Sequence, residues 1–197
     1  LCHCSTRDSV TYVRLAKEAG LAVSGEVCPH HFAMCDEDIT EDDGNFKMNP
    51  PLREREDMEA LREGLRDGVM DVIATDHAPH GEAEKNQSMA KAPFGIVGLE
   101  TAFSLGVTVL VKGGYLTPMQ LVEKMSRNPG RILGIHAGCL APGYPADLVI
   151  ADPDREYVID PADFYSKGKN TPFAGRKVSG KVLRTLVGGR TVYCAQE

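Results

Sequence analysis

Long apolar runs and a surplus of basic residues are both missing from this sequence, and each absence argues against a class of protein. No stretch approaches the roughly 20 consecutive apolar residues that a membrane-spanning helix needs. The formal net charge is -6 and the isoelectric point is near 5.5, whereas binding to nucleic-acid phosphates calls for a basic face. We therefore expect no membrane and no nucleic acid among the partners.

An initiating methionine, a secretion signal and an Arg-rich transit segment are absent as well. The chain opens directly on Leu1-Cys2-His3-Cys4, which has the character of the middle of an element. We therefore expect these 197 residues to be the C-terminal part of something longer.

A regular cysteine pattern is also lacking. The six cysteines, at positions 2, 4, 28, 35, 139 and 194, are too sparse and irregular for the disulfide framework of a small secreted protein. The spacing of Cys2 and Cys4 does not match a zinc knuckle, and no second pair completes one. We expect reduced thiols that behave as small buried apolar groups, and a cytoplasmic location.

The first part of the chain alternates between strand and helix patterns. A strand end at residues 2–5 leads into a helix capped at Thr6 and closed by Gly20, and residues 21–28 form the next strand. A second helix over residues 54–67 leads into a strand that begins at Asp71. Strand, helix and strand in this order predict a parallel sheet of an α/β protein.

The last part of the chain has a different character. Helices are expected over residues 99–112, from Thr117 through Met125, and from Asn128 to near Gly134. Short strands follow at residues 146–150, 157–159, 180–187 and 190–193, with a hairpin turn at Gly188-Gly189. We place a domain boundary near Gly138, which gives domains 1–137 and 138–197.

Chemistry is concentrated where the apolar run Val72-Ile73-Ala74 stops. Asp76, His77 and His80 follow it within a few residues, and these are ligand types that zinc and similar divalent ions use. In a barrel of parallel strands, ionisable residues at the carboxyl ends of strands form the active site. The sequence therefore predicts that a buried strand carries a site at its tip.

Two further stretches contain residues suited to ligand binding. The consecutive prolines of Asn49-Pro50-Pro51-Leu52-Arg53 fix an extended path and hold Asn49 and Arg53 in set positions. Residues 81–93 lack periodicity and predict a mobile loop, and the glycine-rich segment 94–98 after it allows a ligand to approach the backbone closely.

These pieces, in this order, resemble the dihydroorotase branch of the amidohydrolase superfamily over nearly the whole chain. The matching stretches are Cys2-His3-Cys4-Ser5-Thr6, Glu26-Val27-Cys28-Pro29-His30-His31, Asn49-Pro50-Pro51-Leu52-Arg53, Ala74-Thr75-Asp76-His77-Ala78-Pro79-His80, residues 93–101, Ala146-Asp147-Leu148-Val149 and residues 170–175. The resemblance implies the last three strand–helix units of a (β/α)₈ TIM barrel, followed by most of a small β-domain.

The resemblance also implies an activity and roles for individual residues. Members interconvert N-carbamoyl-L-aspartate and L-dihydroorotate in pyrimidine biosynthesis at a site with two metal ions, usually zinc. His3 would bind one ion, and Asp76 would bind the other and carry a proton from the attacking hydroxide to the leaving ring nitrogen. Asn49, His80 and the Phe94-Gly95 backbone would hold the substrate.

Several parts of the family's site have no counterpart in these residues. The His-x-His pair of the first strand, the bridging carboxylate or carboxylated lysine of the fourth strand, the histidine of the fifth strand and a substrate-binding arginine are all missing. We therefore expect the isolated chain to be inactive. We expect its exposed edges to be covered by the N-terminal half of the barrel, as another chain or segment, or within a homodimer.

Alternatives remain open at this stage. The activity could be that of an allantoinase or a hydantoinase, or the chain could be a non-catalytic scaffold partner. A third metal ion could bind Cys2, Glu26 and His80. We interpret His30 and His31 as residues that support the site, His77 as structural, and His136 as a surface residue at a helix end.

Overall fold

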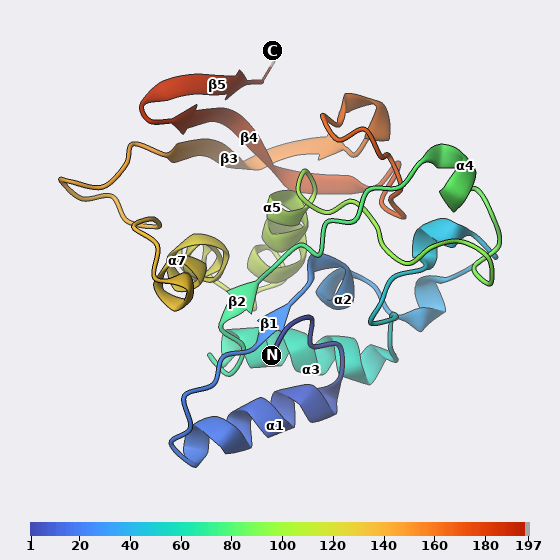
Figure 1. Cartoon of the computed structure of the whole chain (residues 1–197), viewed down its shortest axis with the longest axis horizontal. Coiled ribbons are helices and arrows are strands. Elements are labelled where there is room, and N and C mark those ends of the chain that lie inside the picture. The colour runs from blue at the N-terminus through green and yellow to red at the C-terminus, as the bar shows by residue number, and fades with distance from the viewer. Residues whose placement is uncertain (196–197) are drawn as a thin grey trace. The chain divides into compact units, whose positions relative to one another are not determined.

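The computed structural model describes residues 1–195, which form two compact units (Figure 1). The first unit combines Leu1–Ala102 with Val158–Arg176. The second unit combines Phe103–Tyr157 with the chain from Lys177 onward. The division expected at residues 137 and 138 falls inside the second unit and stays a prediction.

Two amphipathic helices, α1 (Arg7–Glu18) and α3 (Arg55–Arg66), lie side by side in the first unit (Figure 1). The Oγ1 atom of Thr6 caps α1 by accepting a hydrogen bond from the Ser9 N–H, and Gly20 follows the helix with a φ of 76°. Both features were expected from the sequence. An added Cβ at Gly64 of α3 would lie 2.9 Å from a Val10 methyl group, so the glycine lets the two helices approach closely.

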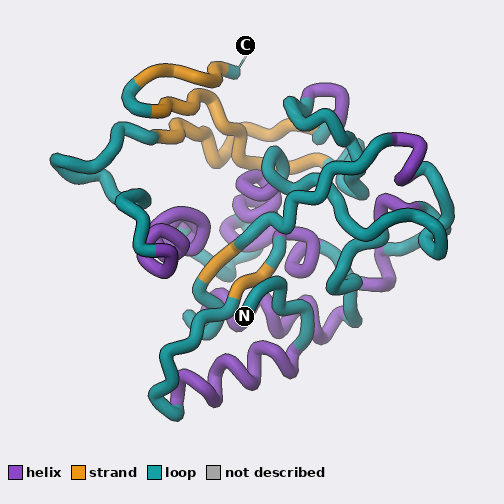
Figure 2. The backbone as a smooth tube through the Cα atoms, viewed as in Figure 1, coloured by secondary structure: helices purple, strands orange, loops and turns teal. Residues whose placement is uncertain are grey.

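The strands of the first unit are parallel but shorter than the sequence predicts. Strand β1 (Glu26–Val27) pairs with β2 (Val72–Ile73) in the register Glu26 to Val72 and Val27 to Ile73. Backbone hydrogen bonds also join Glu26 to Leu1 and Cys4, so residues 1–4 run along β1. Figure 2 shows that regular strand is a small part of this unit and that loops continue each strand. The sequence therefore predicts the order of elements correctly and overestimates the strand lengths.

Two further helices of the first unit are short. Pro29 begins helix α2 (Pro29–Ala33), because a proline is well suited to the first turn of a helix. Helix α4 (Glu82–Lys85) lies within the segment for which no regular structure was expected. Single 3₁₀ turns complete the unit: η1 (Asp36–Asp38), η2 (Gly44–Phe46) and η5 (Pro161–Asp163).

The second unit begins with two helical segments that contain wide π turns. Helix α5 (Ala102–Leu105) continues as the π turn η3 (Gly106–Val111), and α6 (Pro118–Val122), η4 (Glu123–Arg127) and α7 (Asn128–Leu133) form one run. Thr117 and Gln120 form the expected capping box. The expected interruption at Asn128 is replaced by the π turn, a local widening that accompanies kinks near prolines.

A three-stranded sheet completes the second unit, in the order β3 (Leu148–Val158), β4 (Lys177–Val187) and β5 (Arg190–Cys194). Gly188 and Gly189 have φ values of 55° and 77°, as the predicted hairpin turn requires. Strand β3 is one strand where two were expected. It tolerates Pro153 because β3 lies at the edge of the sheet, where a missing N–H breaks no ladder.

Apolar side chains form the core of the first unit. Among the residues with almost no exposure are Phe32, Met48, Leu61, Leu65 and Met70. The longest described helices, α1 and α3, have 12 residues each. Within residues 1–195 no helix has the length and apolar character needed to cross a bilayer.

Candidate metal and substrate site

A bulge in the segment that runs along β1 determines the position of His3. The Glu26 N–H donates to Leu1 O at 3.1 Å, and the Cys4 N–H donates to Glu26 O at 2.9 Å. Leu1 and Cys4 are three positions apart, whereas an even parallel ladder places such partners two apart. The extra residue is accommodated by His3, whose φ is 52°. A bulge of this kind redirects a side chain, as often occurs next to active sites.

Asp76 has the same unusual backbone conformation three residues beyond β2. Its φ is 49°, and in the described part of the chain His3 and Asp76 are the two non-glycine residues with a positive φ. This left-handed region is unfavourable for residues with a Cβ, and it persists where the surroundings enforce it. Such residues cluster at functional sites.

The two strained residues point their side chains at each other. His3 Nε2 lies 3.5 Å from Asp76 Oδ1, and both side chains are partly exposed. On its other edge, His3 Nδ1 lies 2.8 Å from Glu26 Oε1, which also accepts the His3 backbone N–H at 3.1 Å. The carboxylate of Glu26 therefore favours a proton on Nδ1 and leaves the Nε2 lone pair facing Asp76.

These residues fit a divalent metal ion. A histidine that binds a metal through one ring nitrogen commonly donates its other N–H to a carboxylate, as His3 is placed to do toward Glu26. Donor atoms 3.5 Å apart can bind one ion or two neighbouring ions, since ions in two-metal sites are about 3.5–4 Å apart. His3 and Asp76 are thus brought together, as their predicted role requires, and the role itself stays a prediction.

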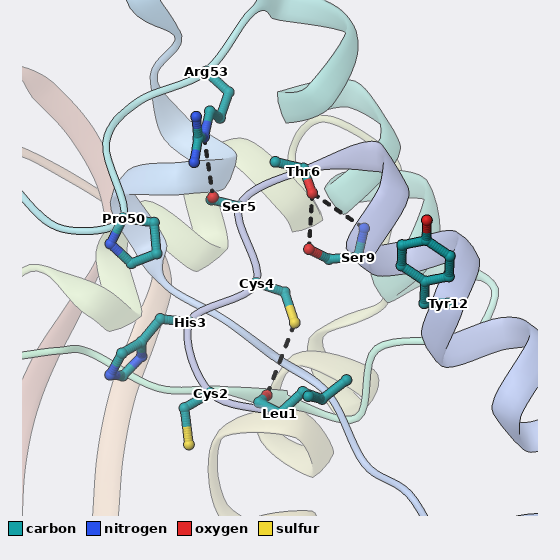
Figure 3. Close-up of a pocket in the computed structure, with 10 residues that line it drawn as sticks. All are labelled: Leu1, Cys2, His3, Cys4, Ser5, Thr6, Ser9, Tyr12, Pro50 and Arg53. Carbon is teal, nitrogen blue, oxygen red and sulfur yellow. Dashed lines mark hydrogen bonds between the residues drawn. The ribbon is translucent and has the colours of Figure 1, made fainter.

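His3 also lines an open pocket of about 430 Å³ (Figure 3). Pro50 and Arg53 line the same pocket from the proline-rich stretch, and Arg53 Nε donates to Ser5 Oγ at 3.3 Å. Asn49 is exposed directly before Pro50. The stiff segment therefore lies beside His3, whereas Asn49 and Asp76 are not among the residues that line this pocket. The substrate role of Asn49 stays a prediction.

A second group gathers the remaining predicted substrate residues. His80 Nε2 lies 2.9 Å from Phe94 O, and the next residue, Gly95, is buried with a φ of 122°. The Phe94 ring is 57% exposed, with Lys47 Nζ 4.6 Å from its centre. The structure thus brings His80, Phe94 and Gly95 together.

Two residues that sequence reasoning missed hold this group in place. Lys85 Nζ donates to the carbonyls of Pro93 and Gly95, at 3.0 and 2.8 Å, and Asn170 Nδ2 donates to Gly95 O at 3.0 Å. Lys85 lies in a segment without periodicity, and Asn170 is 75 positions from Gly95. Their burial, at 2% and 5% exposure, is the signal, and it is visible only in the fold.

His77 binds the backbone of the segment that precedes α5. Its Nδ1 accepts hydrogen bonds from the backbone N–H groups of Gly98, at 3.1 Å, and Leu99, at 3.4 Å. The structural role expected for His77 stays a prediction.

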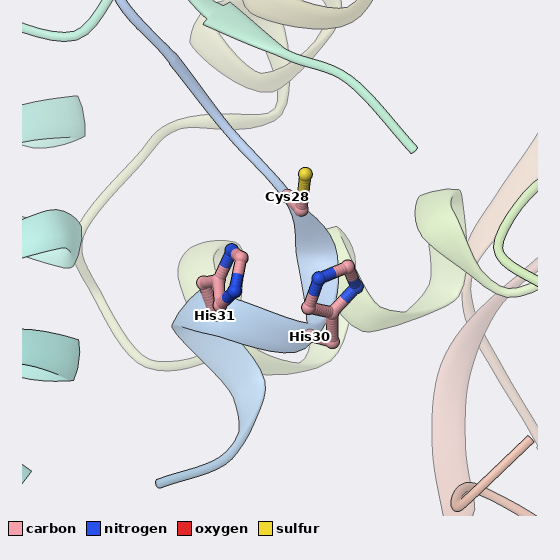
Figure 4. Close-up of side chains that lie close together, drawn as sticks. All are labelled: Cys28, His30 and His31. Atoms are coloured by element: carbon pink, nitrogen blue, oxygen red, sulfur yellow. The ribbon is translucent and has the colours of Figure 1, made fainter. Parts of the chain in front are cut away.

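Cys28, His30 and His31 form another group that could hold a metal ion (Figure 4). All three are buried, and their candidate ligand atoms lie within 4.8 Å of one another. Burial lowers the pKa of His31 to about 4 and also lowers the pKa of His30, so both rings are neutral at pH 7. Neither His30 Nε2 nor His31 Nδ1 has a hydrogen-bond partner in the described structure. The supporting role expected for the two histidines stays a prediction.

Comparison with known proteins gives consistent matches along the chain. The model of the amidohydrolase family matches residues 1–192. The chain is 55% identical to a dihydroorotase of Bacillus caldolyticus over 193 residues, which is 98% of this chain and 45% of that protein. It is also 55% identical to a dihydroorotase of Halalkalibacterium halodurans over 197 residues, which is 100% of this chain and 46% of that protein. The chain therefore spans less than half the length of these relatives.

Solved structures give a similar result. An L-hydantoinase (dihydropyrimidinase) from Arthrobacter aurescens superposes with a TM-score of 0.93 at 32% identity, covering 100% of this chain and 45% of that one. A dihydropyrimidinase from Brevibacillus agri superposes with a TM-score of 0.91 at 26% identity, covering 98% and 44%. The predicted α/β fold, the C-terminal part of a TIM barrel with a small β-domain, is thereby confirmed.

Proposed function

The chain belongs to the amidohydrolase family, and from that premise we propose that it supplies the C-terminal part of a dihydroorotase. Such an enzyme interconverts L-dihydroorotate and N-carbamoyl-L-aspartate in pyrimidine biosynthesis, which takes place in the cytoplasm. Relatives called dihydroorotase are 53–55% identical over nearly the whole chain. Hydantoinases and dihydropyrimidinases superpose well at 24–32% identity. At this lower identity they support the assignment of the fold more than the assignment of a substrate.

The observation that carries this proposal is the pair of strained residues whose side chains meet. Amidohydrolases are generally metal-dependent, and the donor set of His3 and Asp76 suits zinc. In the complete site we assign His3 to one of two zinc ions and Asp76 to the other. When bound, these ions would polarise the substrate carbonyl and make water a stronger nucleophile near neutral pH.

Glu26 and Asp76 then have defined tasks in the reaction. Glu26 holds the His3 ring by its Nδ1–H and backbone N–H. In hydrolysis, water adds to the ring amide carbonyl, the carbon–nitrogen bond breaks, and a carboxyl group and an –NH₂ group form. Asp76 takes the proton released by the water and delivers it to the departing nitrogen. In the reverse direction the same carboxylate removes a proton from the –NH₂ group.

Substrate contacts are assigned to Asn49, His80 and the backbone of Phe94 and Gly95. The small cyclic substrate carries a carboxylate and ring amide groups, which need hydrogen-bond partners in fixed positions. The hydrogen bond between His80 and Phe94 O links two of these partners. We propose that they bind the part of the ring that does not react.

The site in this chain is incomplete. A two-metal site needs more protein ligands than His3 and Asp76, so we propose that the remaining ligands come from polypeptide outside these 197 residues. That polypeptide, or a second copy in a homodimer, would cover the open strand edges. The isolated chain should therefore not turn over dihydroorotate.

A chimera tests this proposal. The N-terminal part of the Bacillus caldolyticus dihydroorotase, which this chain does not match, is fused ahead of Leu1, and dihydroorotate, hydantoin and allantoin are compared as substrates. We expect hydrolysis of dihydroorotate above the other two, none by the isolated chain with zinc added, and a loss of at least about 100-fold in Asp76→Asn, which removes the proton carrier. Preference for hydantoin or allantoin would assign a different substrate. Zinc binding without any turnover would point to a non-catalytic scaffold.

A further inference from the structure

We propose that Lys85 is a positioning residue for substrate binding, which together with Asn170 fixes the backbone of residues 93–95 in the shape that the substrate meets. This inference rests on the proposed function, because it concerns the segment assigned there to the substrate ring. It gives a task to a buried lysine that the reaction itself does not use.

The ammonium group of Lys85 has a complete set of acceptors. Its three N–H groups face three backbone carbonyls: Lys47 O at 3.2 Å, Pro93 O at 3.0 Å and Gly95 O at 2.8 Å. The residue is only 2% exposed. A buried charge is costly unless its hydrogen bonds are satisfied, and here backbone carbonyls satisfy all of them. Lys85 therefore joins α4 to Lys47, directly after η2, and to the 93–95 segment.

Asn170 approaches the same segment from another part of the chain. Its Nδ2 atom donates to Ala78 O and Gly95 O, each at 3.0 Å, and its Oδ1 atom accepts the His80 backbone N–H at 2.9 Å. The side chain is 5% exposed. Asn170 thus joins the loop that carries His80 to the loop that carries Phe94 and Gly95.

Together these contacts account for every carbonyl of residues 93–95. Pro93 O accepts from Lys85, Phe94 O lies at 2.9 Å from His80 Nε2, and Gly95 O accepts from both Lys85 and Asn170. The Gly95 N–H donates to Lys47 O at 3.0 Å. The backbone is therefore fixed from several sides before any substrate binds, which lowers the entropic cost of binding.

Gly95 shows how little freedom the segment has. Its φ of 122° is unfavourable for a residue with a side chain, and an added Cβ would lie 2.4 Å from the Ala78 Cβ and 3.3 Å from His80 Nε2. A shift of this backbone would therefore move His80 as well. Loss of Lys85 should mainly lower the affinity for substrate, because Lys85 does not contact His3 or Asp76 in the described structure.

Burial lowers the pKa of Lys85 to about 8. The charged groups that face it oppose each other, since Asp43 raises the pKa and Lys47 lowers it. The group therefore remains mostly protonated at neutral pH, with all three donors present.

The test compares Lys85→Met with Lys91→Met in the chimera. Methionine has similar length and no donors, and Lys91 is an exposed lysine of the same segment. We expect Lys85→Met to raise the KM for dihydroorotate about tenfold or more, because substrate binding must then also order the 93–95 backbone, with kcat changed less than about threefold and zinc content unchanged. Lys91→Met should match the parent. Asn170→Ala should act in the same direction as Lys85→Met.

A second readout separates this inference from the proposed function. Hydrogen exchange of the Gly95 and Val97 amides, which donate to Lys47 O and Asn170 O, should be faster in Lys85→Met whether or not the chimera is active. A folded Lys85→Met protein with unchanged KM and unchanged exchange would overturn the proposal, as would an equal loss of kcat at constant KM. If Lys85→Met does not fold, Asn170→Ala supplies the same two measurements. Absence of turnover by the parent chimera would count against the proposed function alone.

Discussion

His3 and Asp76 hold backbone conformations that each cost a residue with a side chain about 1–3 kcal/mol. The neighbouring structure enforces both conformations: the bulge against β1 for His3 and the end of β2 for Asp76. The result is a histidine nitrogen 3.5 Å from a carboxylate oxygen at one end of the parallel strands. At the scale of single residues, the backbone strain of His3 and Asp76 and the meeting of their side chains are the strongest signs of a site.

Glu26 should tune the metal affinity without binding the metal. In Glu26→Gln the charge that favours a proton on His3 Nδ1 is lost, so the ring is less firmly held and less basic. We expect zinc affinity of the chimera to fall about 10–100-fold, the range found when such partners are removed, as measured by competition with a chromophoric chelator. Glu18→Gln, at the exposed end of α1, is the matched control. Equal affinity in both variants would mean that Glu26 does not orient His3.

Candidate site residues could be identified from the sequence only where neighbours in sequence carry the signal. Asp76 and His80 are four positions apart, after an apolar run, and His3 lies in a short recognisable stretch. Lys85 and Asn170 gave no such signal, because their partners are backbone carbonyls brought close by the fold. Glu26 was noted only as a ligand of a third metal ion, whereas its observed contact is with His3.

At the scale of elements, helix α2 places two neutral histidines in the core. The His30 and His31 rings are 4.2 Å apart at their centres, and His31 Nε2 lies 2.9 Å from Pro50 O. Since Pro50 lines the pocket beside His3, α2 connects the core to the proline-rich stretch. Helix α2 therefore places His31 in direct contact with a segment that lines the pocket of His3.

The depressed pKa of His31 predicts how stability depends on pH. The folded pKa is about 4 and the ordinary value is 6.5, so between these values the unfolded chain binds a proton that the folded chain does not. The free energy of unfolding should therefore rise with pH from about 4 to 6.5 and level off above, and His31 should contribute about 3 kcal/mol of this rise.

Urea unfolding of the chain with chelator present, at one protein concentration, checks this expectation. His31→Gln should make the rise between pH 4 and 6.5 smaller without abolishing it, because burial also lowers the pKa of His30. Replacement of the exposed His136 by Gln should leave the whole rise in place. A His31→Gln protein with the full rise would show that His31 is not held neutral by burial.

The elements themselves were predictable to different degrees. Helices α1 and α3 follow from capping residues and apolar spacing, and the β4–β5 hairpin follows from Gly188-Gly189. The strands β1 and β2 are shorter than their apolar runs, because pairing continues only where neighbouring backbones stay parallel. Strand β3 runs through Pro153 because it is an edge strand, and edge position is a property of the sheet that its own sequence does not reveal.

At the scale of the whole molecule, the proposed function gives the chain part of one site. Its relatives are about twice as long, since the chain covers 45–46% of them. The order of strands and helices and the confirmed fold were predictable, because they follow from motifs in register along the sequence.

The central claim is that His3 and Asp76 bind the same cluster of divalent ions once the remaining ligands are present. Anomalous diffraction at the zinc edge from crystals of the zinc-loaded chimera tests it most directly. We predict two peaks about 3.5–4 Å apart, one about 2.0–2.1 Å from His3 Nε2 and the other about 2.0–2.2 Å from an Asp76 oxygen. Zinc bound only at Cys28, His30 and His31, or His3 and Asp76 both without an adjacent peak, would contradict the claim.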